Sequence, residues 1–130
     1  MIVCVRTVQI PAEHRDRYLT WIEENRELRE RHGILFELVL ERSPHQNPPK
    51  AMGLREPIPG IDGTAIVLTA WASHEAFDAW IETPDRDRLT ASDVHASVEH
   101  GPITRHDVAG GYVHIDGLAA VAEQIGEVLP

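Results

Sequence analysis

Alternating apolar and polar positions at the start of the chain predict a β-strand over residues 1–10. Both of its faces carry apolar side chains, with Ile2, Cys4, Val8 and Ile10 on one face and Val3 and Val5 on the other. A proline and an acid at 11–13 then predict the first turn of a long helix, which ends at Gly33. The predicted buried side of this helix carries His14, Tyr18, Trp21, Ile22, Asn25 and Leu28.

Two further strands are predicted over residues 34–42 and 64–71. In the first, Ile34, Phe36, Leu38 and Leu40 share one face, and Leu35 and Val39 alternate with Glu37 and Glu41 on the other. The second is apolar on both faces, which is typical of a central strand. The segment 43–62 between them holds five of the nine prolines, which predicts a long loop, and loops of this length often act as lids or binding segments.

The rest of the chain predicts one more helix and strand, followed by a tail. Ser73 is a helix N-cap residue, and Phe77, Trp80 and Ile81 form the buried stripe of a helix that ends before Pro84. Residues 85–100 predict short helical turns, and residues 103–108 a fourth strand. After the break at 110–111, residues 112–115 suggest a short extended segment and residues 117–129 an amphipathic helix.

This order of elements predicts an α+β protein with a ferredoxin-like β-α-β-β-α-β arrangement and an added C-terminal helix. At 130 residues, a single domain over 1–130 is expected. Helices would cover only one face of the antiparallel sheet, although the strands at 1–10 and 64–71 are apolar on both faces. A homodimer that packs two sheets face to face, a dimeric α/β barrel, would cover the remaining apolar face. The tail helix either completes the core or crosses to the partner.

Composition narrows the classes of function. The chain has 42% hydrophobic and 25% charged residues, no apolar run long enough for a membrane span, and no basic leader followed by an apolar stretch, so a soluble cytoplasmic protein is expected. A net charge of −9 and scattered basic residues disfavour nucleic-acid binding. The single cysteine, Cys4, is expected to be a small buried residue rather than a reactive thiol.

The block 68–81, Leu-Thr-Ala-Trp-Ala-Ser-His-Glu-Ala-Phe-Asp-Ala-Trp-Ile, resembles the antibiotic-biosynthesis-monooxygenase family of dimeric α/β barrels. The shared features are a Trp that ends a strand, a helix that opens with Ser-x-Glu, and Phe-x-x-Trp on that helix. The resemblance covers roughly residues 1–108. It implies a pocket between sheet and helices, where some members oxidise electron-rich polycyclic phenols with O₂ and without metal or flavin.

Another branch of that family degrades haem with an Asn on the first strand, a Trp at the end of the third strand and a His after the second helix. Trp71 matches the second residue, and His95 matches the third only if extra residues are allowed before it. The first strand offers Val5, Arg6 and Thr7 where the Asn is needed, which argues against haem degradation.

Oxygenation without a cofactor requires flat apolar walls and a polar group that stabilises an ionised phenol. The candidate catalytic residues are Trp71, His95 and Arg6, the latter two as stabilisers of an enolate or phenolate. The candidate substrate-binding residues are Trp21, Asn25, Tyr18, Phe77 and Trp80. Four of these residues also have an ordinary structural explanation: Trp71, Phe77 and Trp80 as core, and Arg6 in a salt bridge with a nearby acid.

No metal site and no tightly bound cofactor are expected. His95, Glu99, His100 and His106 lack the spacing of a ligand set and are interpreted as a surface cluster. The leading hypothesis is therefore a monooxygenase-like enzyme that acts on a small, flat, mostly apolar substrate. The alternatives are a non-catalytic ligand-binding or accessory dimer of the same fold, and an isomerase or decarboxylase with His95 or another His as base.

Overall fold

The computed structural model describes the whole chain except residues 44, 46–47, 49, 51–63 and 129–130. Most of the predicted loop 43–62 lies outside the described residues. Among those described, no helix is both long enough and apolar enough to cross a membrane.

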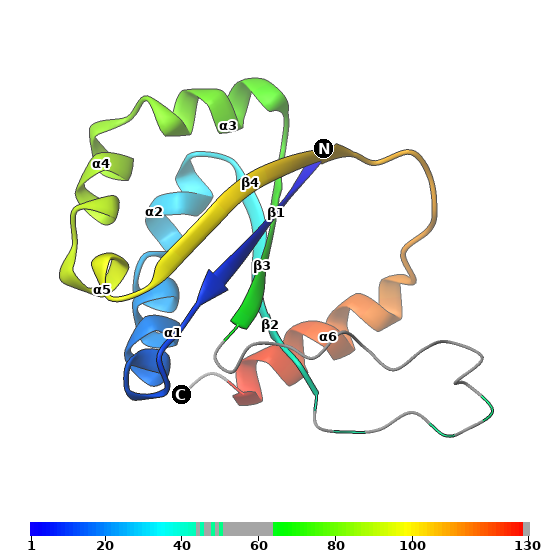
Figure 1. The fold of residues 1–130 in the computed structure, drawn as a ribbon. Coiled ribbons are helices and arrows are strands. Elements are labelled where there is room, and N and C mark those ends of the chain that lie inside the picture. The colour runs from blue at the N-terminus through cyan, green and yellow to red at the C-terminus, as the bar shows by residue number, and fades with distance from the viewer. Residues whose placement is uncertain (44, 46–47, 49, 51–63, 129–130) are drawn as a thin grey trace.

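Four antiparallel strands form one sheet in the order β2-β3-β1-β4 (Figure 1). They are β1 (Ile2–Gln9), β2 (Ile34–Glu41), β3 (Thr64–Trp71) and β4 (Glu99–Asp107). The strand 64–71 has the predicted bounds and is central, as its apolar faces indicated. The α+β class and the ferredoxin-like order of elements are confirmed.

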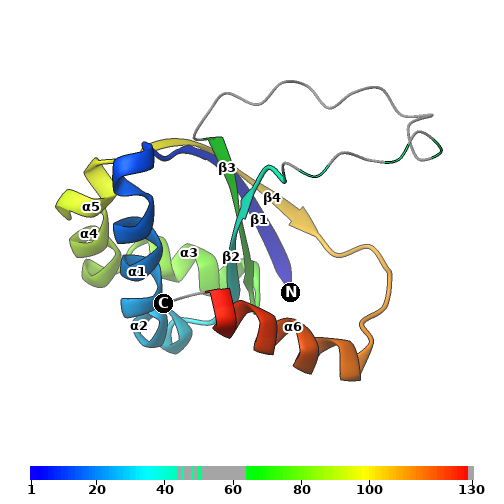
Figure 2. The same ribbon diagram turned by 90° about the horizontal axis from the view of Figure 1, so that it is seen from below.

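Helices α1 to α5 lie on one side of this sheet (Figures 1 and 2). Their bounds, with that of a preceding 3-10 turn, are η1 (Ala12–His14), α1 (Arg15–Glu24), α2 (Arg26–Arg31), α3 (His74–Ile81), α4 (Pro84–Thr90) and α5 (Asp93–Ala96). Ser73 caps α3 as predicted, because its Oγ accepts a hydrogen bond from the Ala76 amide at 3.0 Å. A single helix over 11–32 was wrong: Asn25 separates α1 from α2, and its side-chain Nδ2 donates to the Trp21 carbonyl at 2.7 Å.

A register shift near the start of β2 decides which side chains face the helices. Ile34 lies opposite Trp71, but the next aligned pair is Phe36 with Ala70, so one extra residue is inserted. Ile34 therefore packs in the helix-side core, whereas Phe36, Leu38 and Leu40 lie on the open face. The prediction that Ile34 shares the face of the other three was wrong, because a bulge interrupts the period-two alternation.

The C-terminal part of the chain differs most from the prediction. Strand β4 begins at Glu99, four residues before the predicted start, and tolerates Pro102 because it is an edge strand that pairs only with β1. The predicted extended segment 112–115 is not a strand: residues 112–114 have no regular structure, and Ile115 begins helix α6 (Ile115–Val128). Helix α6 extends on the open side of the sheet (Figure 2). Leu118 and Val121 are about half exposed, so α6 does not complete the core of this chain.

The sheet has one filled and one open face. On the helix side, buried residues form two clusters, one around Val8, Tyr18 and Val67 and one around Ile2, Trp71 and Trp80. On the open side, Leu40 and Ile66 are 44% and 41% exposed. The space between the two clusters, beneath the helices, is where the candidate site lies.

Candidate functional site

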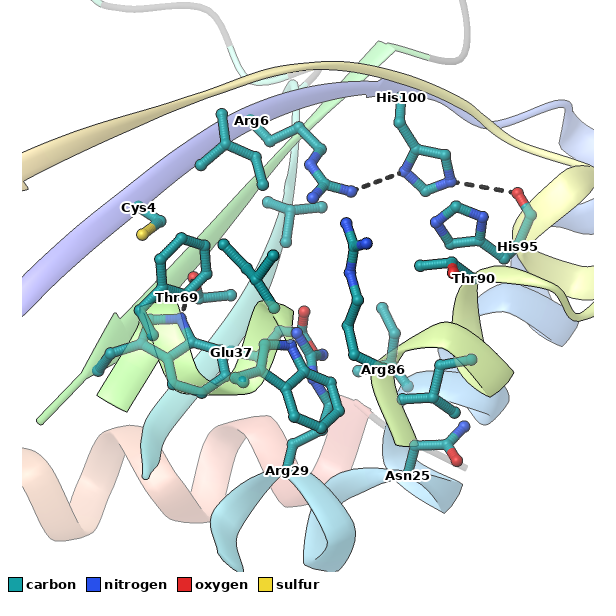
Figure 3. A pocket seen from close by; sticks show the side chains of 18 of the residues that line it. Cys4, Arg6, Asn25, Arg29, Glu37, Thr69, Arg86, Thr90, His95 and His100 are labelled. Carbon is teal, nitrogen blue, oxygen red and sulfur yellow. Dashed lines mark hydrogen bonds and ion pairs between the residues drawn. The ribbon is translucent and has the colours of Figure 1, made fainter. Parts of the chain in front are cut away.

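A cavity of about 410 Å³ lies between the helix-facing side of the sheet and helices α1 to α5 (Figure 3). Its size is that of a pocket for a drug-sized ligand. All eight residues predicted as catalytic or substrate-binding line it: Arg6, Tyr18, Trp21, Asn25, Trp71, Phe77, Trp80 and His95. They come from β1, α1, β3, α3 and α5 and the α1–α2 junction, so only the tertiary fold brings them together.

One end of the cavity is walled by aromatic rings. The Trp71 ring centroid lies 5.2 Å from that of Phe77 and 6.0 Å from that of Trp80. Trp71 is 1% exposed, and its Nε1 donates to Thr69 Oγ1 at 3.2 Å. These three rings are therefore both core and cavity wall, and the two interpretations that the sequence left open do not exclude each other.

The other end is polar and centres on Arg6. Arg6 pairs with Val67 of β3 and with Ile103 of β4, and Val67 pairs with Val39 of β2. These four side chains form one row on the helix-facing side of the sheet. No carboxylate among the described residues forms an ion pair with Arg6, so the expected salt bridge with a nearby acid was wrong. The Arg6 guanidinium instead donates from Nη1 to His100 Nδ1 at 3.0 Å (Figure 3).

This contact fixes the state of His100. Its Nε2 lies 3.1 Å from the carbonyl oxygen of His95, which can only accept, so Nε2 carries the hydrogen. Its Nδ1 faces a guanidinium, which can only donate, so Nδ1 is unprotonated. His100 is therefore neutral in this arrangement. Burial, which disfavours the charged imidazolium, lowers the pKa of His100 and favours the same neutral form.

His95 stacks on His100 with ring centroids 3.9 Å apart and an interplanar angle of 12°. Burial lowers the pKa of His95 to about 4, and the nearby His100, Arg6 and Arg86 add to the effect. Its imidazole is thus neutral at pH 7 and has no hydrogen-bond partner among the described residues. The His95 ring also lies near Trp21, and the centroids of these two rings are 6.1 Å apart.

Tyr18 and Asn25 contribute less polar function than the sequence suggested. Tyr18 is 4% exposed, stacks on Trp21 at 5.9 Å, and has a pKa raised to about 12 by burial. It is therefore a neutral phenol throughout the physiological range. The amide nitrogen of Asn25 is occupied by the Trp21 carbonyl.

Four arginine, glutamate and histidine residues that line the cavity were not predicted as site residues: Arg29, Glu37, Arg86 and His100. Arg29 and Glu37 pair across the α2–β2 turn through Nη1 and Oε1, and the buried Nε of Arg29 has no partner among the described residues. An acid within an otherwise apolar strand was the available signal for Glu37. His100 had been placed in a surface cluster with His95, which was wrong for these two residues, whereas Glu99 and His106 are exposed.

Two other expectations concern sulfur and metal. Cys4 is buried, as predicted, and burial raises the pKa of its thiol, so the neutral form is favoured. Within the described part of the chain, no group of three or more His, Cys, Asp or Glu side chains is arranged to hold a metal ion.

Comparison with known proteins relates the fold to solved structures. No protein-family model and no curated protein sequence matches the chain. An antibiotic biosynthesis monooxygenase structure is similar, with 18% identity over 85% of this chain and 100% of that chain and a TM-score of 0.53. SnoaB, a cofactor-independent oxygenase from Streptomyces nogalater, is 10% identical over 87% and 97% of the two chains, with a TM-score of 0.60.

The heme-degrader MhuD from Mycobacterium tuberculosis, with two hemes bound in its active site, is 16% identical over 87% of this chain and 100% of that chain, with a TM-score of 0.59. Identities this low establish the fold and leave the reaction open. The chain has the antibiotic-biosynthesis-monooxygenase fold, as the resemblance of residues 68–81 implied. Solved proteins with this fold include a cofactor-independent oxygenase and a heme-degrader.

Proposed function

We propose that this protein is a monooxygenase-type enzyme that oxidises a flat, mostly apolar, electron-rich substrate without a tightly bound cofactor. The observation that carries the proposal is a single cavity of about 410 Å³ with aromatic walls at one end and Arg6 and His95 at the other. A substrate ring would pack against Trp71 and Phe77, while its ionisable oxygen would face the polar end. Similarity in fold to a cofactor-independent oxygenase supports the same class of reaction.

The chemistry requires an anion, because O₂ reacts readily only with an electron-rich carbanion or phenolate. For a methylene group between aromatic rings, loss of one proton gives the carbanion, and transfer of electrons to O₂ forms a C–O bond and a peroxide. The peroxide takes up a proton and eliminates water to leave a ketone. The sum is R₂CH₂ + O₂ → R₂C=O + H₂O, so the substrate supplies all the electrons.

The two polar candidates, Arg6 and His95, have different roles in these reaction steps. Arg6, held in place by its hydrogen bond to His100, stabilises the developing oxyanion by charge. His95 is neutral, carries no hydrogen bond in the described structure and lies beside Arg6, so it is placed to take up and return a proton. Its low pKa limits its strength as a base, and a bound anion would raise that pKa by removing the unfavourable field of Arg6.

A base-catalysed isomerase or decarboxylase is the second candidate, because the strongly perturbed His95 would serve that reaction equally. A non-catalytic ligand-binding protein is the third. Haem degradation fits less well, since β1 places Arg6, and no asparagine, on the cavity wall.

We also propose that the protein works as a homodimer. The open face of the sheet carries Phe36, Leu38, Leu40, Ile66 and Leu68 in adjacent strands, and three of these large side chains are more than a third exposed. Such a contiguous apolar surface is typical of an interface. A second copy of this chain, with the same apolar face, is a matching partner.

Anthrone tests the reaction, because it is flat, carries a methylene between two aromatic rings and tautomerises to a polycyclic phenol. Oxygen uptake and anthraquinone formation are measured with the wild type, with buffer and with heat-unfolded protein. We expect the folded protein to accelerate both equally, and Arg6→Met and His95→Gln to reduce the rate at least tenfold. The matched control is His74→Gln, because His74 is an exposed histidine at the start of α3, away from the open face of the sheet, and does not line the cavity.

Binding of anthrone without oxygen uptake above the buffer rate would refute the oxygenase and favour the binding protein. A proton exchange of the methylene group that proceeds without O₂ consumption would favour the isomerase instead.

A further inference from the structure

The cavity carries more positive than negative charge, although the whole chain has a net charge of −9. Three guanidinium groups line it, those of Arg6, Arg29 and Arg86, and the only carboxylate among the described lining residues is that of Glu37. Glu37 is engaged with Arg29. Two positive charges are therefore left over inside a pocket that is otherwise largely aromatic.

The other arginines show that this surplus is particular to the cavity. Five arginines of the described chain pair with carboxylates: Arg15, Arg26, Arg29, Arg88 and Arg105. Those without such a pair are Arg17, Arg31 and Arg42, which are exposed, and Arg6 and Arg86, which are partly buried in the cavity wall. A guanidinium that is partly withdrawn from water without an acid partner is unfavourable.

The neighbouring histidines do not neutralise this charge. His100 is already neutral and accepts from Arg6, and His95 carries no negative charge in either protonation state. Arg86 extends from α4 toward Arg6 and His95 (Figure 3). The positive field of Arg86 contributes to lowering the pKa of both Arg6 and His95, which places the three groups within electrostatic reach of one another.

We propose that Arg6 and Arg86 form a clamp for an acid group, so that the substrate is a flat aromatic compound bearing a carboxylate. Carboxylates fit guanidinium groups through two parallel hydrogen bonds, and such charge-assisted bonds are stronger than neutral ones. The substrate carboxylate, held between Arg6 and Arg86, offsets one of the two surplus positive charges. The oxyanion that forms on the substrate in the proposed reaction offsets the other. The substrate class rests on the proposed function, but the clamp itself is a property of binding.

Calorimetric titration at pH 7.5 with 2-naphthoate and 2-naphthamide tests the clamp, because the two probes share a ring system and differ in charge. We expect the wild type to bind the acid at least tenfold more tightly than the amide. Arg86→Met should reduce this preference to about twofold or less, because it weakens binding of the charged acid much more than binding of the neutral amide. Arg6→Met should also reduce the preference, which provides a second variant if one of them fails to fold.

The matched control is Arg88→Met, because Arg88 lies on the same helix, is exposed and pairs with Asp85 outside the cavity. It should keep the full preference. Equal binding of the two probes by the wild type, a preference that survives both Arg86→Met and Arg6→Met, or no binding of either probe by the folded protein would overturn the clamp.

Failure of the clamp and failure of the oxygenase give different results. A preference for the acid without oxygen uptake on anthrone leaves the clamp in place and refutes the reaction. Oxygen uptake on anthrone without a preference for the acid refutes the clamp and leaves the proposed reaction in place.

Discussion

Replacement of His95 by Gln tests the electrostatics of the cavity through the pH dependence of stability. In the folded protein, burial and neighbouring positive charges lower the pKa of His95 to about 4. In the unfolded chain the same imidazole titrates near 6.5, so between about pH 6.5 and 4 the unfolded state binds the proton more readily. The contribution of this site to stability is therefore fully present above about pH 6.5 and is lost as the pH falls toward 4.

The size of the effect follows from the difference in pKa. One pKa unit corresponds to about 1.4 kcal/mol. Between the unfolded-state pKa of about 6.5 and pH 4.5, roughly two such units of stability are lost. The ring is only partly buried, and solvent screening reduces the effect to about 1–2 kcal/mol. Gln has a similar size and does not titrate, so His95→Gln removes this contribution.

The assay is urea unfolding of both proteins between pH 7.5 and 4.5, at one protein concentration because the proposed dimer would dissociate as it unfolds. We expect the variant to gain about 1–2 kcal/mol relative to the wild type as the pH falls. His114→Gln, at an exposed position, should show no such change. Parallel curves for wild type and His95→Gln, or a relative loss by the variant on acidification, would refute the assigned environment of His95.

Three further predictions concern packing and assembly. Trp71→Phe removes part of a buried ring and the hydrogen bond to Thr69, so it should cost about 2 kcal/mol in urea unfolding and weaken binding of 2-naphthol at least threefold. Unchanged binding of 2-naphthol by the folded variant would contradict the role of Trp71 as a cavity wall. Ile66→Glu places a charge on the open face, so light scattering should report the chain mass of 14.6 kDa where the wild type gives twice that value, and an unchanged mass would disprove this interface. Gly33→Ala should lower stability by about 1–2 kcal/mol in thermal unfolding, because Gly33 has φ of 99° and the new Cβ would lie 3.1 Å from Ala76 Cβ; an unchanged Tm would contradict this.

Much of the fold follows from local patterns. The strand at 64–71, the Ser73 cap and the buried stripe of Phe77 and Trp80 depend on residues close together in the chain. Propensity and periodicity act over the same short range, which is why the strand was predicted with its bounds and the helix with its start. The aromatic candidates for the cavity wall came from the resemblance of residues 68–81 to a known family and from the pocket that it implies, because helical spacing alone favours core positions.

The deviations arise where tertiary packing overrides the pattern. The insertion between Ile34 and Phe36 changes the face of a strand without any break in its apolar sequence. At Asn25, which separates α1 from α2, both the backbone amide and the side-chain Nδ2 donate to the Trp21 carbonyl, a local arrangement that the helical pattern of the sequence does not indicate. The early start of β4 at Glu99 is set by pairing with β1, since an edge strand accepts Pro102.

The sequence by itself determined the class of fold and the central strand, because both depend on short-range repeats, and its resemblance to a known family indicated the aromatic residues of the site. Only the tertiary structure decided the electrical character of the cavity. Arg6 and His100 are 94 residues apart and hydrogen-bond only because β4 lies beside β1, and Arg86 reaches the same space from α4. Whether a charged side chain forms an ion pair or a hydrogen bond depends on the distances between secondary-structure elements. The spacing of residues along the chain does not give those distances.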